Sequence, residues 1–79
     1  MGDGVKWKLW KYDGNYIQGE LISQHNTEAA AIKKAKKEIA FHESVKEQRD
    51  GETIIWLDAE DGTPLGIITK KISKKGSKK

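Results

Sequence analysis

Hydrophobic and polar side chains alternate in the first part of the chain. In KWKLWK, residues 6–11, the alternation has a period of two, which is typical of a half-buried β-strand. Asp13-Gly14 is a turn sequence, and a second extended pattern follows over residues 16–23. Gly19 weakens that second stretch or marks a bulge. We therefore predict an N-terminal β-hairpin.

Residues 28–40, EAAAIKKAKKEIA, repeat apolar side chains at helical spacing. Asn26 and Thr27 before them are N-cap candidates, and the alanines and lysines have high helix propensity. A continued helix would aim Phe41 at the lysines, so we expect the helix to end at about residue 40–42 and Phe41 to turn inward. One face of the helix carries Ala31, Ile32, Ala35 and Ile39, and the opposite face carries Lys33, Lys34 and Lys37.

Three further short stretches are predicted to be strands. They span residues 45–49, 52–59 and 64–71, and turn sequences at Asp50-Gly51 and at residues 60–64 separate them. The predicted element order is ββαβββ. The expected fold is therefore α+β, with an antiparallel sheet of about five strands and one helix packed across one face.

Length and charge indicate one small domain with a basic tail. The chain has 79 residues and a net charge of +3. Residues 70–79 hold six lysines and no acid, whereas residues 1–69 hold nine basic and twelve acidic residues. We expect residues 1–69 to form a single monomeric domain and residues 70–79 to be a disordered lysine-rich tail, because such a run has too little apolar surface to fold.

The composition also bears on location. Cysteine is absent, so neither disulfides nor thiolate metal sites are expected. No apolar run approaches the ~20 residues that a membrane span needs, and the first ten residues lack the order of a signal peptide. We expect a cytoplasmic protein that does not interact with membranes.

Residues of catalytic type occur without a catalytic arrangement. His25 and His42 lack zinc-site spacing, and His42 is expected to cap the C-terminus of the helix. Asp58, Glu60 and Asp61 cluster in a solvated turn, whereas general acid–base catalysis needs carboxyl groups with pKa values that a cleft has separated. We predict no enzymatic activity, no metal and no cofactor.

The basic helix face and the exposed aromatics remain as candidate contact residues. Lysines on the outside of a helix are often only solvated, but they can also neutralise phosphates of a nucleic acid. Aromatic side chains near them would suit stacking on single strands or would simply cover the sheet. The candidate residues are Lys33, Lys34, Lys37, Trp10, Tyr12 and Tyr16.

AKKEIAFHESV, residues 35–45, and its spacing to IIWLDAEDG, residues 54–62, resemble the ninth family of anti-CRISPR inhibitors of type I-F systems. That family has a basic helix that runs into a Phe-His pair, a valine three residues later, and a downstream apolar strand with Trp that ends in Glu-Asp-Gly. The resemblance covers about residues 27–62. The matching residues are Ala35, Lys37, Glu38, Phe41, His42, Val45, Glu60, Asp61 and Gly62.

The resemblance implies a non-catalytic phage or mobile-element protein with a five-stranded antiparallel sheet and one helix. Such inhibitors bind the repeated backbone subunit of an RNA-guided surveillance complex and obstruct pairing of guide RNA with target DNA. They can also promote nonspecific duplex DNA binding by that complex. Basic helix positions of the family fall on Lys33 and Lys37 here, whereas a third falls on Ile32 and would move some charge to Lys34.

The sequence therefore leaves three hypotheses of function. The leading hypothesis is an inhibitor that binds a surveillance complex through the helix lysines and blocks target recognition. The alternative is a small standalone DNA- or RNA-binding module that uses the same lysines on phosphates. A structural host protein with the same fold is the third.

Overall fold

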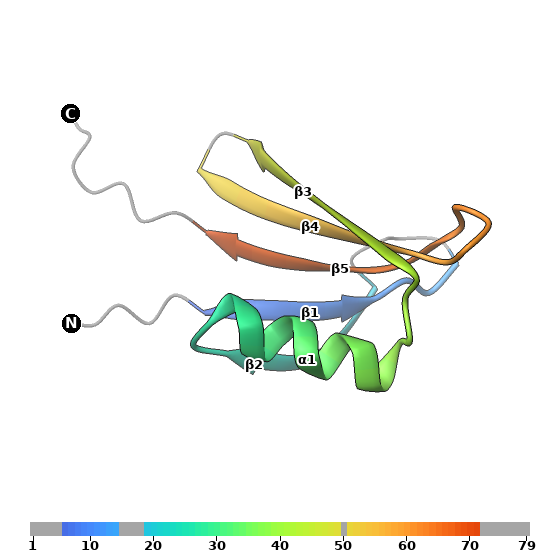
Figure 1. Ribbon diagram of the computed structural model, residues 1–79. Helices are drawn as coiled ribbons and strands as arrows, with labels where there is room; N and C mark the ends of the chain where they lie inside the picture. Colours follow the sequence, from blue (N-terminus) through green and yellow to red (C-terminus); the bar gives the residue numbers. More distant parts are fainter. Residues whose placement is uncertain (1–5, 15–18, 50, 72–79) are drawn as a thin grey trace, which may run out of the picture.

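A computed structural model describes residues 6–14, 19–49 and 51–71. Five strands and one helix follow in the order ββαβββ, which confirms the predicted fold class (Figure 1). Their bounds are β1 Trp7–Lys11, β2 Glu20–His25, α1 Glu28–Glu38, β3 Glu43–Arg49, β4 Glu52–Asp58 and β5 Pro64–Lys71. Strand β5 thus runs two residues into the segment assigned to the tail, and residues 72–79 lie outside the described residues.

The five strands form one antiparallel sheet in the order β2-β1-β5-β4-β3. The last strand in the sequence, β5, lies in the centre, between the β1–β2 hairpin and the β3–β4 hairpin. Hydrogen bonds of β5 to both hairpins therefore join the two ends of the chain into one sheet. Figure 1 shows α1 lying across the β1–β2 side of this sheet.

Local sequence explains both ends of α1. Thr27 has an extended backbone, and its hydroxyl accepts a hydrogen bond from the Ala30 amide at 3.2 Å. At the other end the amides of Ile39 and Ala40 donate to the carbonyl of Ala35, at 2.7 and 3.2 Å. Ala40 has φ of 57°, a left-handed conformation that ends helices. The helix therefore stops at Glu38, a little earlier than predicted.

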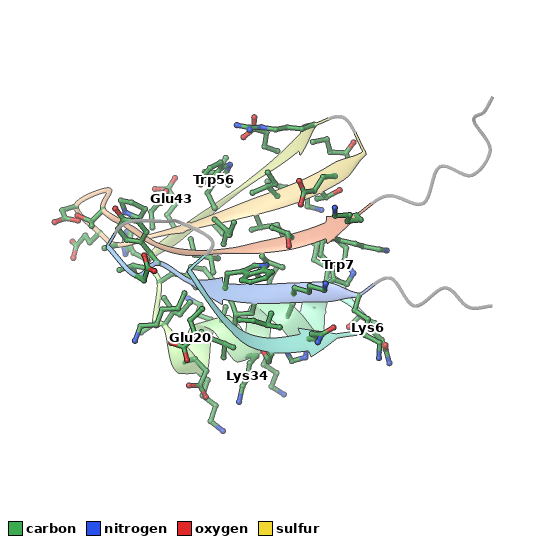
Figure 2. The ribbon with its side chains drawn as sticks, turned by 180° about the vertical axis from the view of Figure 1, so that it is seen from behind. Lys6, Trp7, Glu20, Lys34, Glu43 and Trp56 are labelled. Carbon is green, nitrogen blue, oxygen red and sulfur yellow. The ribbon has the colours of Figure 1, made fainter. Side chains whose placement is uncertain are left out.

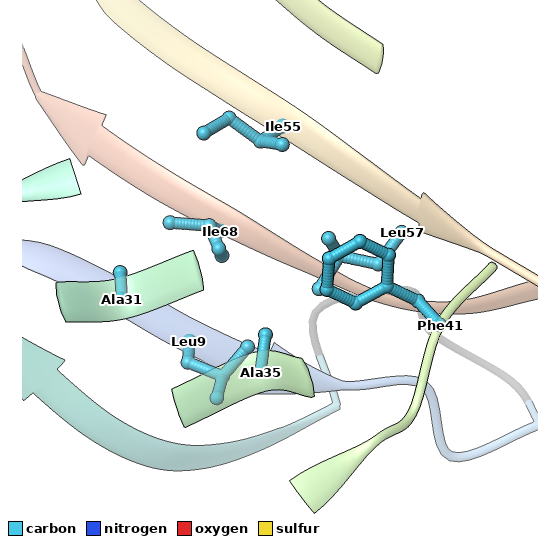
Figure 3. Packing of buried hydrophobic residues seen from close by; sticks show 7 residues of the cluster. All are labelled: Leu9, Ala31, Ala35, Phe41, Ile55, Leu57 and Ile68. Carbon is cyan, nitrogen blue, oxygen red and sulfur yellow. The ribbon is translucent and has the colours of Figure 1, made fainter. Parts of the chain in front are cut away.

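The early stop turns Phe41 into the core, as predicted. Phe41 is 6% exposed and belongs to the same buried cluster as Leu57 (Figure 3). The buried side chains of the core come from the helix, from three strands and from the connection after the helix, so the core joins α1 to the centre of the sheet. Its members are Leu9, Ala31, Ala35, Phe41, Ile55, Leu57 and Ile68.

One local feature of the sheet differs from the prediction. Leu9 pairs with Ser23 and Trp10 pairs with Leu21, so Ile22 is an extra residue in β2. This bulge turns Ile22 toward the core and leaves Leu21 on the other face. Gly19, the predicted bulge position, lies just before β2.

Candidate functional site

Two helix lysines form an exposed basic surface. Lys33 and Lys37 lie four residues apart on the side of α1 away from the sheet, which places them about 6 Å apart along the axis. Among the described residues neither ammonium group has an ion-pair or hydrogen-bond partner. Ala29 and Ala30 are exposed on the same side. We call these four residues the lysine face.

The neighbouring helix lysines are already engaged within the domain. The Lys34 ammonium lies 3.1 Å from Glu38, four residues later, and Figure 2 shows Lys34 on the helix at the edge of the fold. The Lys36 ammonium lies 4.9 Å from the centroid of the Phe41 ring, a cation–π distance. The predicted contact set is therefore narrower in the structure: Lys33 and Lys37 offer uncompensated charge, and Lys34 offers partly compensated charge.

The predicted aromatic residues do not surround the lysine face. Trp10 lies on the face of the sheet that α1 leaves uncovered, because it pairs with Ile67 while its neighbour Leu9 enters the core. Tyr12 follows β1 and borders a shallow open depression of about 460 Å³ beside Ile39 and Leu65. Tyr16 lies outside the described residues. Of the two alternatives for the aromatics, Trp10 therefore covers the sheet and does not lie beside the helix lysines.

The position of Ile32 follows from packing. Ile32 is partly buried and packs against the core. Ile32 therefore faces the sheet and is not part of the lysine face. Among the helix positions compared with the anti-CRISPR family, Lys33 and Lys37 are the ones that face outward in this chain.

A second surface was not predicted from the sequence. The face of the sheet opposite α1, here called the open face, is turned toward the reader in Figure 2. One side chain from each strand lies in register across it, because each is the direct partner of the next. We call this line the apolar row, and it consists of Leu21, Trp10, Ile67, Trp56 and Val45.

The two tryptophans of the apolar row are held by hydrogen bonds. The Trp10 indole N–H donates to Thr69 Oγ1 at 2.9 Å, on the central strand. The Trp56 indole N–H donates to Glu47 Oε1 at 2.8 Å, on the edge strand β3. Both polar ends are thus satisfied while part of each ring stays accessible.

Glu47, on the open face, is held through both oxygens of its carboxylate. Its other oxygen, Oε2, lies 3.0 Å from Arg49 Nε. The hydrogen bond from Trp56, and next the one from Arg49, hold the pKa of Glu47 below its ordinary value. Glu47 is therefore ionised at neutral pH, and Arg49 partly compensates its charge.

The histidines and the acidic turn make local contacts. A 2.8 Å hydrogen bond joins the Ser23 hydroxyl and His25 Nε2. The backbone amide of His42 donates to the carbonyl of Asp58, and amides of earlier residues bond the last helix carbonyls. His42 is thus not the helix cap that the sequence predicted. The Thr63 amide donates to Asp61 Oδ1 at 3.0 Å. The hydrogen bond from the Thr63 side chain, and next the one from its amide, hold the pKa of Asp61 below its ordinary value.

Comparisons with known proteins add no relatives. No protein-family model, curated protein or solved structure matches this chain. The resemblance to the anti-CRISPR family therefore stays a prediction. Over residues 6–14, 19–49 and 51–71, no group of three or more His, Asp or Glu side chains is placed to bind a metal ion. In the same residues no helix has the length and apolar character of a membrane span.

Proposed function

We propose that this chain is a non-enzymatic inhibitor of the anti-CRISPR kind. It binds the backbone subunit of an RNA-guided surveillance complex through the lysine face and blocks recognition of target DNA. The observation that carries the proposal is the pair Lys33 and Lys37, exposed one turn apart and without a partner among the described residues. The likeness of residues 27–62 to the inhibitor family supplies the choice of target.

The chemistry of the lysine face fits such a contact. Two ammonium groups about 6 Å apart match an acidic patch on a protein or neighbouring phosphates of a nucleic acid. Ala29 and Ala30 beside them are small, so a partner can approach the helix closely. Charges at the edge of an interface mainly speed encounter and fix orientation.

A binding assay tests the proposal with a matched pair of variants. Purified protein is added to a type I-F surveillance complex, and binding of labelled target DNA is followed by gel shift. We expect Lys33→Gln with Lys37→Gln to raise the concentration needed for inhibition about tenfold or more. The control, Lys34→Gln with Lys36→Gln, removes the same charge from the same helix and keeps helix propensity. We expect it to inhibit nearly as well as the wild-type protein.

The outcomes separate the inhibitor from the standalone module. If the protein alone shifts duplex DNA with a steep salt dependence, and the Lys33 and Lys37 changes abolish that shift, then the standalone nucleic-acid-binding function is correct. If both double variants lose inhibition equally, the effect depends on net charge and the lysine face is not the contact. Full inhibition by the Lys33 and Lys37 variant would refute the proposal.

A further inference from the structure

The open face carries a row of apolar side chains with exposed ends and a buried centre, because Ile67 is only 4% exposed. Sheets with one solvated face usually place polar residues outward, yet here one apolar side chain from every strand lies in the apolar row. Leu21 is 39% exposed and Val45 is 48% exposed, at the two ends of that row. Exposed aliphatic residues at both edges, with partly accessible tryptophans between them, give this face more than a single exposed apolar side chain.

The apolar row has the same order of residue types from either end. It begins and ends with an aliphatic residue, has a tryptophan next to each end, and has Ile67 on the central strand. A two-fold axis parallel to β5 would place this row on a second copy of itself. Trp10 of one copy would then lie over Trp56 of the other, and the axis would pass over the buried Ile67 of both. Two-fold interfaces require such self-complementary surfaces.

Charges on the open face select the same arrangement. A second row of strand partners lies next to the apolar row and consists of Lys8, Thr69, Ile54 and Glu47. Lys8 contributes its β1 position and Glu47 its β3 end. The β3–β4 side also carries Glu43, Glu52 and Asp58 on this face, with Arg49 as its one basic group in β3 and β4. An axis parallel to β5 brings the Lys8 side of each copy against the acidic side of the other. An axis across the strands would bring like sides together.

The same charges argue against a nucleic acid as the occupant. Tryptophans on a sheet suit base stacking, but Arg49 already lies 6.0 Å from the centroid of the Trp56 ring and pairs with Glu47, and phosphates there would meet the acidic groups Glu43, Glu52 and Asp58. The low pKa of Glu47 keeps that carboxylate charged. A second copy meets the acidic side with its own lysine, so it fits both the apolar and the charged parts of the open face.

The area is sufficient for a weak dimer. Five strands about 4.8 Å apart and six residues of about 3.3 Å each cover roughly 500 Å² on each copy. The total of about 1,000 Å² is at the lower limit of specific interfaces. We propose that the open face is a self-association surface, on which two copies pack sheet against sheet about a two-fold axis parallel to β5.

This proposal is independent of the lysine face. Stacking two open faces leaves both helices on the outside, so Lys33 and Lys37 of each copy stay accessible. The dimer would present two lysine faces. Failure of self-association would therefore leave the proposed inhibitor function unaffected, and loss of inhibition would leave the open face unaffected.

A charge-swap experiment tests the arrangement. Sedimentation equilibrium of the full chain, from micromolar to millimolar concentration, gives the dimer constant for each variant. We expect Lys8→Glu and Glu47→Lys each to weaken self-association about tenfold or more, because two like-charge contacts form in each homodimer. An equimolar mixture of the two variants should regain the wild-type constant. Lys37→Glu, the same charge change on the opposite surface, should leave the constant unaltered.

A second pair protects the test if Glu47→Lys disturbs the fold. Leu21 and Val45 are exposed already, and the axis places Leu21 of one copy over Val45 of the other. Leu21→Lys and Val45→Glu should each weaken the dimer, and their mixture should associate more strongly than either alone. A wild-type chain that stays monomeric at millimolar concentration would overturn the proposal. Equal weakening by Lys37→Glu would also overturn it.

Discussion

Replacement of Phe41 by alanine measures how strongly the inward turn after α1 stabilises the domain. Phe41 is 6% exposed and belongs to the same buried cluster as Leu57. Burial of a phenyl ring is worth about 1.5–3 kcal/mol, and the cavity left by its removal raises the usual cost of Phe→Ala to about 3–5 kcal/mol. We expect about 3–4 kcal/mol. The total stability of a chain of this size is roughly 4–12 kcal/mol, so the variant should be close to unfolding.

The assay is urea denaturation followed by circular dichroism, at a protein concentration low enough to keep the chain monomeric. Val45→Ala is the control, because Val45 is 48% exposed and its truncation should cost well under 1 kcal/mol. Lys36→Ala isolates the cation–π contact with Phe41, worth about 0.5–1 kcal/mol. A Phe41→Ala cost below about 1 kcal/mol would mean that the helix continues and Phe41 points to solvent.

Two further predictions concern backbone strain and pH. Ala40 is exposed with φ of 57°, so Ala40→Gly should stabilise the protein by about 0.5–1 kcal/mol, because relief of the left-handed strain exceeds the added entropy of the unfolded chain. A higher thermal midpoint checks this, and an unchanged or lower midpoint contradicts it. The folded-state pKa of Glu47 is lowered, so its contribution to stability is complete above about pH 4.3 and is lost as the pH falls through the folded-state pKa. The thermal midpoint should fall in that acidic range, and Glu47→Gln should reduce the fall.

Much of the fold could be predicted because local signals agreed. The period-two pattern near Trp7, the cap at Thr27 and the turn before Pro64 each specify structure within a few residues. The inward turn of Phe41 followed from a conflict, since a longer helix would have exposed a large apolar ring among lysines. The bulge at Ile22 gave no such signal, because it depends on how β2 pairs with β1.

The site could be predicted only in part, because some of its features depend on contacts between residues far apart in the sequence. Helical periodicity placed Lys33, Lys34 and Lys37 on one side, but their different availability depends on the ion pair of Lys34 with Glu38. The apolar row joins residues up to 57 positions apart in pairing, such as Trp10 and Ile67. Alternation along one strand cannot reveal such a row, because the strand order and register must be known first.

The arrangement of layers places the lysine face and the open face on opposite sides of the domain. A sheet must bury at least one face, and in this chain α1 covers β1 and β2 while Phe41 belongs to the same buried cluster as Leu57. A domain of this size buries only about 60% of the surface of its unfolded chain, and over residues 6–14, 19–49 and 51–71 no second helix covers the open face. Trp10 and Trp56 instead shield parts of that face themselves, since Ile67 between them is only 4% exposed. A second copy is the simplest further layer under the proposed self-association, because it requires no other protein. It also leaves the lysine face free for a different partner.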